Sequence, residues 1–148
     1  MAIMKKRIKD TAKRHFISYV DGACTKLGVG GSGGFLCSEG TITNVFYLDQ
    51  NNTTNNQMEL TGAILALLAF SEISKKGDSI VINSDSQYVV KGINEWIYGW
   101  IKKGWKSTSG PVLNMDLWKL FHYLVEEIRL TNDVEFRWVR GHNGNPGR

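Results

Sequence analysis

The sequence predicts an α/β domain built on a mixed β-sheet, and the order of its apolar patterns is the reason. Strand-like runs cover His15–Asp21, Phe35–Cys37 and Thr41–Leu48, and their close spacing favours a three-stranded antiparallel meander. A long helical pattern then covers residues 55–70, and another strand-like run follows at Ser79–Asn83. Because a helical crossover between two strands of one sheet makes them parallel, the sheet should contain both kinds of pairing.

The first strand and the long helix are the elements expected at the centre. Both alternating faces of His15–Asp21 are largely apolar, which is typical of an interior strand. Thr54, Asn55 and Asn56 are good N-cap residues, and every residue from 63 to 70 is apolar. The helix is therefore expected to be buried on more than one face.

The second half of the sequence predicts two more helices and a last strand. Gln87–Ile97 has a helical pattern with a break expected at Gly92 or Asn94. Asp116–Ile128 is amphipathic, and Val134–Val139 is strand-like. No repeat or linker divides the chain, so 148 residues are interpreted as one domain.

Composition limits the class of protein. The two cysteines, Cys24 and Cys37, do not require a disulfide framework, which favours a reduced, cytoplasmic setting. No apolar run approaches the roughly 20 residues of a membrane span, so we expect no membrane association, and we expect a monomer. The net charge of +4 is compatible with a polyanionic partner but does not establish one.

The N-terminal residues form a basic segment. Residues 1–14 contain six lysines and arginines against the single acid Asp10, with too few apolar residues for a core. A solvated terminus is favoured over a nucleic-acid contact. We therefore expect a basic tail over residues 1–14 and a folded domain over residues 15–148.

Acidic side chains stand at three suggestive places. Asp21 ends a buried strand, where an unpaired carboxylate would be costly, and Glu59 shares a helix face with small apolar residues. Asp85 follows the carboxyl end of the returning strand, where ligands gather in open α/β sheets. Glu59 is expected in the first turn of the helix. The alternatives are that it only complements the helix dipole there, and that Asp85 caps the next helix. Together the acids are expected to form a Mg²⁺ site.

Aromatic and basic residues alternate in the segment from Trp96 to Lys106. Such interleaving serves nucleic-acid surfaces, where cations meet phosphates and rings pack on sugars or bases. For the rings a core role is an equal alternative, whereas contact is favoured for the lysines. The residues concerned are Trp96, Trp100, Trp105, Lys102, Lys103 and Lys106.

Several sequence blocks, in this order, resemble type 1 ribonuclease H. They are Tyr-Val-Asp21-Gly-Ala-Cys24, Thr54-Asn-Asn-Gln-Met-Glu59-Leu, Ser84-Asp85-Ser-Gln-Tyr-Val, the segment from Trp96 to Lys106, and Trp138-Val-Arg-Gly-His142. The resemblance implies a five-stranded mixed sheet flanked by helices. It also implies metal-dependent endonucleolytic cleavage of the RNA strand of an RNA–DNA hybrid, leaving 5′-phosphate and 3′-hydroxyl ends. Mg²⁺ or Mn²⁺ is the implied cofactor, with two ions when substrate is bound.

The resemblance also implies roles for individual residues. The implied metal ligands are Asp21, Glu59 and Asp85, and His142 matches a loop histidine that assists proton transfer and product release. The positions that touch the hybrid near the cleavage site are matched by Cys24, Asn55, Asn56 and Gln87. The basic protrusion that holds the DNA strand is matched by Trp96, Trp100, Lys102 and Lys103.

One departure from the family pattern keeps other readings open. The family has a fourth carboxylate beyond the loop histidine, whereas no Asp or Glu follows Glu135 in this sequence. Neutral oxygens of Asn143 or Asn145, or the terminal carboxylate of Arg148, are candidate substitutes. The alternatives to an active enzyme are a catalytically impaired hybrid-binding module and a DNA-cutting nuclease of the wider superfamily.

Overall fold

A five-stranded mixed sheet carries the fold in the computed structural model, which describes residues 13–141. The strands are β1 (His15–Cys24), β2 (Gly30–Ser38), β3 (Thr41–Gln50), β4 (Ser79–Ser84) and β7 (Asp133–Trp138). Their order across the sheet is β3-β2-β1-β4-β7. The β1–β2 and β2–β3 pairs are antiparallel, whereas β1–β4 and β4–β7 are parallel. The predicted meander and the predicted parallel pair are both confirmed.

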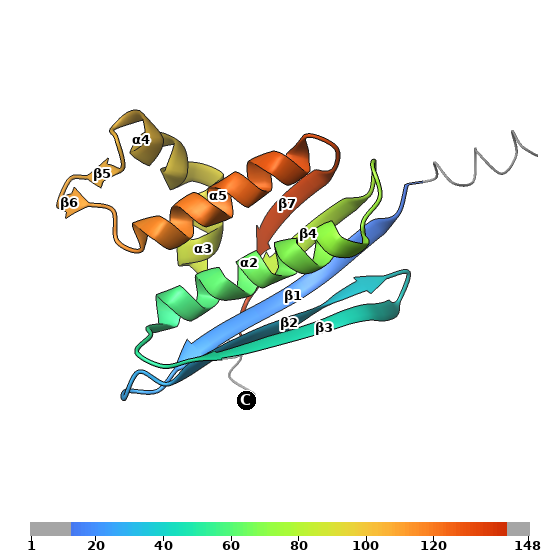
Figure 1. The fold of residues 1–148 in the computed structure, drawn as a ribbon, viewed down its shortest axis with the longest axis horizontal. Coiled ribbons are helices and arrows are strands. Elements are labelled where there is room, and N and C mark those ends of the chain that lie inside the picture. Colours follow the sequence, from blue (N-terminus) through green and yellow to red (C-terminus); the bar gives the residue numbers. More distant parts are fainter. Residues whose placement is uncertain (1–12, 142–148) are drawn as a thin grey trace, which may run out of the picture.

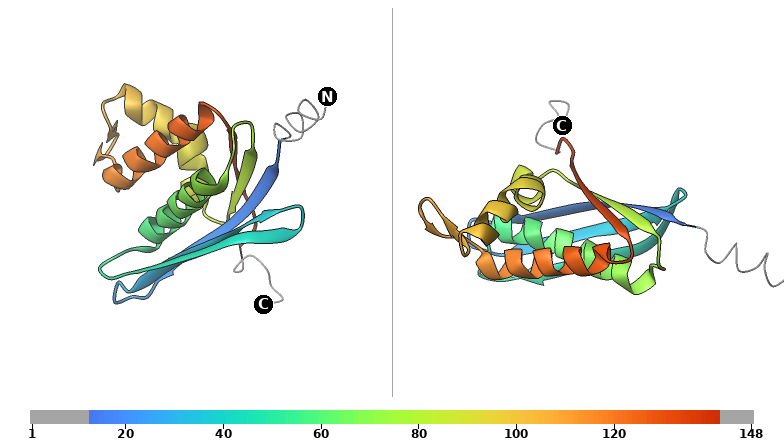
Figure 2. Two further views of the ribbon diagram at one scale, coloured as in Figure 1. Left: turned by 45° about the vertical axis from the view of Figure 1, so that its right-hand side comes forward. Right: turned by 90° about the horizontal axis from the view of Figure 1, so that it is seen from above.

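The two long helices, α2 (Asn55–Ile73) and α5 (Met115–Arg129), pack side by side over one face of this sheet (Figures 1 and 2). Between them in the chain come α3 (Gln87–Lys91), the π-helix η1 (Gly92–Trp96) and α4 (Ile97–Lys102), and α4 lies beyond the sheet (Figure 1). A short hairpin of β5 (Lys106–Ser107) and β6 (Gly110–Pro111), which the sequence did not predict, follows α4. Within residues 13–141 no helix combines the length and hydropathy needed to span a membrane.

Helix α2 is the centre of the core. Its residues Ala63, Ala66, Leu67 and Phe70 have no exposed surface, and the Phe70 ring meets the ring of Phe16 edge-on at 5.5 Å between centroids. Alternate residues of β1 point toward the helix, because successive side chains of a strand face opposite ways. The prediction that α2 is buried on more than one face is confirmed.

Strand β2 begins earlier than the sequence predicts. The predicted strand starts at Phe35, whereas the observed one starts at Gly30 and includes a run of glycines. These glycines leave room for aromatic side chains of β3: a Cβ on Gly31 would lie 2.6 Å from the Tyr47 hydroxyl. The run is therefore a strand adapted to neighbouring rings, and not a loop.

The break predicted near Gly92 is a π-helical turn. Gly92 lies under the Trp118 indole, where an added Cβ would stand 2.6 Å from Cζ2 of that ring. Asn94 then donates a hydrogen bond of 3.2 Å from Nδ2 to the carbonyl of Phe136 in β7. This turn marks the point where the chain leaves the core toward α4.

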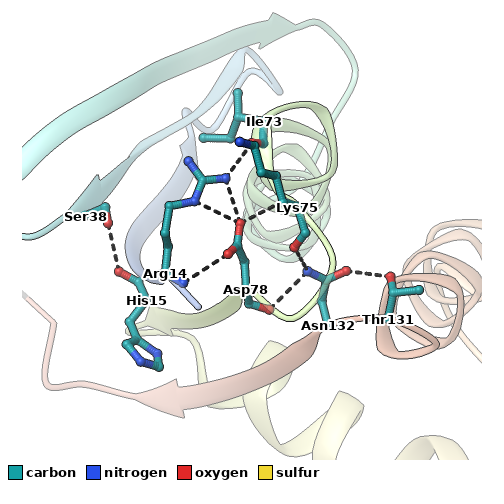
Figure 3. Close-up of polar contacts among 8 residues, drawn as sticks. All are labelled: Arg14, His15, Ser38, Ile73, Lys75, Asp78, Thr131 and Asn132. Carbon is teal, nitrogen blue, oxygen red and sulfur yellow. Dashed lines mark hydrogen bonds and ion pairs between the residues drawn. The ribbon is translucent and has the colours of Figure 1, made fainter. Parts of the chain in front are cut away.

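A polar cluster around Asp78 lies at the end of the sheet where β1 and β4 begin (Figure 3). It joins the segment before β1, the loop between α2 and β4, and the loop between α5 and β7. Asp78 is 1% exposed and accepts hydrogen bonds from the Arg14 guanidinium at 2.7 and 3.1 Å, and from the backbone N–H groups of Arg14 and Lys75. Asn132 donates to the carbonyls of Lys75 and Asp78. Arg14, which the sequence assigns to the basic tail, therefore takes part in the folded domain.

We expect Asp78→Ala to lower the free energy of unfolding by about 2–4 kcal/mol, because it leaves buried N–H donors unsatisfied. Burial alone would raise the pKa of Asp78, but the bonds from Arg14 and the N–H groups lower it overall. The stabilisation should thus be present above the unfolded pKa of about 3.9 and be lost as pH falls through the folded pKa. Urea unfolding of wild type and Asp78→Ala at pH 7 and near pH 3 measures the loss of stability in the variant and its dependence on pH. Asp133→Ala, an exposed neighbour, should change stability by less than about 0.5 kcal/mol.

Candidate active site

Asp21 lies near the carboxyl end of β1, the central strand of the sheet. The backbone N–H of Gly22 donates a 2.9 Å hydrogen bond to Asp21 Oδ1. The next residue, Gly22, is where α2 crosses closest to β1: a Cβ there would lie 2.7 Å from the backbone nitrogen of Glu59 and closer still to the Met58 carbonyl. This contact between main chains brings the carboxylate of Glu59, on α2, close to the carboxylate of Asp21, on β1.

Glu59 does not lie in the first turn of its helix, so that part of the sequence interpretation is wrong. Thr54 is the N-cap, with its side chain accepting a 3.2 Å bond from the N–H of Gln57, and no acid falls in the first turn. Glu59 is one turn further along, where it cannot complement the N-terminal dipole. Its position is instead set by the crossing over β1.

Asp85 connects β4 to α3 and caps neither element. The N-cap of α3 is Ser86, whose hydroxyl accepts from the N–H of Val89 at 3.2 Å. The capping alternative for Asp85 is therefore wrong. Its backbone carbonyl accepts a 3.0 Å hydrogen bond from Nε1 of Trp138, and Gly141 lies against its carboxylate.

The carboxylates of Asp21, Glu59 and Asp85 converge as the sequence predicts. One oxygen from each lies within 4.8 Å of the others. Glu59 Oε1 and Asp85 Oδ1 are buried and have no hydrogen-bond partner among the described residues. Burial, followed by repulsion from Asp85 and Asp21, raises the pKa of Glu59 from its ordinary value of 4.5 to about 8. Unsatisfied buried oxygens that repel one another are what a divalent cation neutralises.

The raised pKa of Glu59 predicts an unusual pH dependence without metal. Between about pH 5 and 8 the folded chain holds a proton that the unfolded chain releases, so the free energy of unfolding falls as pH rises. Each unit of pKa difference between the folded and unfolded chain changes the free energy of unfolding by about 1.4 kcal/mol. Because Glu59 is partly exposed, solvent screening should limit the total fall in the free energy of unfolding to about 2 kcal/mol. We expect Glu59→Gln to flatten this slope in urea unfolding with EDTA. Glu72→Gln, an exposed change on the same helix, should keep it; equal slopes for wild type and Glu59→Gln would contradict the repulsion.

The residues expected to touch substrate near the cleavage site lie within four residues of one of the three acids in the sequence. Asn55 Oδ1 accepts a 2.8 Å bond from the backbone N–H of Cys24, which ties the end of β1 to the start of α2. The thiol of Cys24 also points to the Thr53 carbonyl at 3.7 Å. Asn56 and Gln87 are exposed at the first turns of α2 and α3. Both side chains are therefore accessible to a ligand.

A polar chain that the sequence analysis missed joins the starts of α2, α3 and α5. Gln57 Nε2 donates to Asn114 Oδ1, and Asn114 Nδ2 donates to the Tyr88 hydroxyl, each at 3.1 Å. Trp118 Nε1 donates to the same hydroxyl at 2.9 Å. Asn114 has a φ of 58°, and a positive φ away from glycine is uncommon, but no local sequence signal identifies its partners.

The segment around α4 separates aromatic and basic roles. Trp100 packs on the buried Trp118 with 5.2 Å between ring centroids, which supports the core interpretation for this ring. Trp96 is 41% exposed and remains accessible. Lys102 and Lys103 are exposed at the end of α4, as a phosphate contact requires. His142 and the candidate ligands that follow it lie outside the described residues.

Comparison with known proteins gives the same assignment. The RNase H family model matches residues 13–148. The chain is 44% identical over 136 residues to Ribonuclease H of Polaromonas naphthalenivorans, covering 90% of this chain and 80% of that protein. It is 45% identical over 131 residues to Ribonuclease H of Pseudomonas savastanoi pv. phaseolicola, covering 87% and 82%.

Solved structures agree with the sequence relatives. LC9-RNase H1 is described as a type 1 RNase H with the type 2 active-site motif. It is 31% identical to this chain with a TM-score of 0.74, and the match covers 92% of this chain and 67% of that chain. RNase H1 of Halobacterium salinarum shares the fold, with 24% identity and a TM-score of 0.64. The match covers 88% of this chain and 89% of that chain. This chain, with the carboxylates of Asp21, Glu59 and Asp85 brought together, belongs to the RNase H family.

Proposed function

We propose that this protein is a metal-dependent endonuclease that hydrolyses the RNA strand of RNA–DNA hybrids and leaves 5′-phosphate and 3′-hydroxyl ends. The observation that carries the proposal is the convergence of Asp21, Glu59 and Asp85 within 4.8 Å in a chain of the RNase H family. Family membership favours an enzyme over a binding module that only holds the hybrid.

The chemistry of the donor set supports Mg²⁺ or Mn²⁺ as the cofactor. All three donors are carboxylate oxygens, the ligands that these hard cations prefer, and two of the oxygens are buried without partners among the described residues. Bound divalent ions would stabilise the charge that develops on the scissile phosphate and lower the pKa of the attacking water. We propose one ion held by the carboxylates and a second that joins with the substrate phosphate.

The side chains around the carboxylates would bind and orient the hybrid. Asn55 and Asn56 present amide groups and Cys24 a thiol at the junction of β1 and α2, beside the acids. Gln87 presents its amide from the start of α3. Contacts to 2′-hydroxyl groups from such neutral donors and acceptors distinguish an RNA strand from DNA. His142 is proposed to move a proton between the site and solvent.

The segment around α4 would hold the DNA strand at a distance from the cleavage site. Trp96 offers an exposed ring for packing on sugars, while Lys102 and Lys103 offer cations for phosphates. These residues are on a different element from every carboxylate ligand. Their contribution should therefore appear in binding and not in the chemical step.

We expect the double change Lys102→Glu and Lys103→Glu to weaken hybrid binding and to reduce the slope of log K against log salt by about 2, because two phosphate contacts are lost. KM should rise with kcat nearly unchanged. The matched control is Lys75→Glu with Lys76→Glu, an adjacent exposed pair between α2 and β4 with the same change of charge. A collapse of kcat with KM unchanged would contradict the assignment, as would equal weakening by the control pair.

The test of the proposed function is cleavage of an end-labelled RNA strand paired with DNA, compared with the same strand paired with RNA and with duplex DNA. We expect cleavage of the hybrid alone, in Mg²⁺ or Mn²⁺, with 5′-phosphate on the products and no cleavage in EDTA. Hybrid binding without cleavage in either metal would identify the chain as a binding module. Cutting of duplex DNA would identify a DNA nuclease.

Residues 15–148 are proposed to form the catalytic domain, preceded by a basic extension over residues 1–14 whose last residue, Arg14, is joined to the domain through Asp78. β1 begins at His15, which supports this boundary, and residues 1–12 lie outside the part of the chain that the structure describes. We also propose that the domain acts as a monomer in the cytoplasm. The arrangement of the three ligands within one chain supports action as a monomer.

A further inference from the structure

The last residue of β7 and the residues just after it contact Asp85 and the neighbouring Ser84 in three ways. The indole Nε1–H of Trp138 donates to the Asp85 carbonyl at 3.0 Å, and the backbone N–H of Val139 donates to the Ser84 carbonyl at 2.9 Å. Gly141 lies so close to the carboxylate that an added Cβ would stand 2.7 Å from Asp85 Cβ and nearer still to Oδ2. These contacts join positions more than fifty residues apart.

Asp85 needs such support because it belongs to no regular element. Strand β4 ends at Ser84 and α3 begins after its N-cap, Ser86. The N–H of Ser86 is occupied by the Ser84 hydroxyl at 3.1 Å, which forms a tight turn around Asp85. Within that turn Trp138 holds the Asp85 carbonyl from the side of β7, while Asp85 Oδ1 stays buried and without a hydrogen-bond partner among the described residues.

We propose that Trp138 and Gly141 are positioning residues for the metal ligand Asp85. The indole N–H fixes the peptide that carries the ligand, and the missing side chain at Gly141 leaves space for the carboxylate to face Glu59 and Asp21. Groups that orient a metal ligand without touching the ion typically contribute 10–100-fold to metal affinity. This inference rests on the metal site of the proposed function.

The first test compares two tryptophans that each donate one indole hydrogen bond. Trp138→Phe removes the bond to Asp85, whereas Trp118→Phe removes the 2.9 Å bond to the Tyr88 hydroxyl in the core. The full chain is titrated with MnCl₂ by calorimetry, and melting temperature is measured in EDTA and in Mn²⁺. We expect Trp138→Phe to weaken Mn²⁺ binding about tenfold and to reduce the rise in melting temperature with Mn²⁺. Trp118→Phe should lower the melting temperature in EDTA and keep the wild-type Mn²⁺ affinity.

The second test compares two glycines. In Gly141→Ala the new methyl group displaces the Asp85 carboxylate, and we expect Mn²⁺ affinity to fall by at least about tenfold. Gly99→Ala is the control, because a Cβ at Gly99 would meet nothing within 4 Å, and its Mn²⁺ affinity should equal that of wild type.

The outcomes separate the two proposals. Wild-type Mn²⁺ affinity in Trp138→Phe overturns the role of the indole, whatever happens to the melting temperature, and the same result in Gly141→Ala overturns the role of the glycine. If Gly141→Ala does not fold, Trp138→Phe decides, since that side chain is 45% exposed. A wild-type chain without saturable Mn²⁺ binding would instead overturn the metal site itself, and the positioning roles with it.

Discussion

Asp21→Asn should reduce hybrid cleavage at least about a thousandfold, because it removes a charged ligand from the site that would stabilise the reacting phosphate. The same change should leave the metal-free melting temperature unchanged or raise it. Asp21 contributes to the repulsion that raises the pKa of Glu59, and the amide oxygen of Asn can still accept the bond from the Gly22 N–H. Initial rates on a labelled hybrid and thermal unfolding in EDTA measure the two effects.

Loss of activity together with a preserved or higher melting temperature identifies a functional and not a structural carboxylate. Asp78→Ala is the informative comparison, since it should lower stability without touching the metal ligands. A marked fall in the metal-free melting temperature of Asp21→Asn would show that Asp21 holds the fold together, and would contradict the metal-cluster account.

Gly22→Ala should have the largest effect on stability, a loss of at least about 3 kcal/mol. Its Cβ would press into the main chain of α2, at the Met58 carbonyl and the Glu59 nitrogen, and backbone cannot move aside as a flexible side chain can. The helix must lift from β1, which carries Glu59 away from Asp21. We therefore expect urea unfolding to show the loss of stability, and Mn²⁺ titration of the folded fraction to show weakened binding.

Gly62→Ala provides a matched control at the same helix–strand interface. A Cβ at Gly62 would meet its nearest neighbour, the Asp21 carbonyl, at 3.4 Å, which is ordinary contact. Alanine also favours the helix by up to about 1 kcal/mol over glycine. Stability should therefore stay the same or rise. Equal tolerance of alanine at Gly22 and Gly62 would show that the close crossing does not position Glu59.

The convergence of the carboxylates could be predicted because it follows from regular geometry. Asp21 lies near the carboxyl end of β1, Asp85 follows the adjacent parallel strand β4, and Glu59 lies on the face of α2 that packs on β1. Such positions depend on strand order and helical period, which apolar patterns reveal. The roles of Cys24, Asn55 and Gln87 follow from the family resemblance and not from this geometry.

The support of the site could not be predicted, because it depends on contacts between distant parts of the chain. Nothing near Trp138 in the sequence indicates that its indole meets the Asp85 carbonyl, and nothing near Asn114 indicates Gln57. The turn position of Glu59 was misjudged because three residues in succession could cap α2. Local propensity ranks such caps but does not choose between them.

The central claim is that Asp21, Glu59 and Asp85 hold one divalent ion at the cleavage site. Anomalous diffraction from crystals of the chain grown with Mn²⁺ and a hybrid tests it most directly. The account predicts a Mn²⁺ peak within coordination distance of an oxygen from each carboxylate and of the scissile phosphate. A hybrid bound with no ion between these carboxylates, or with Mn²⁺ only elsewhere on the protein, would contradict it.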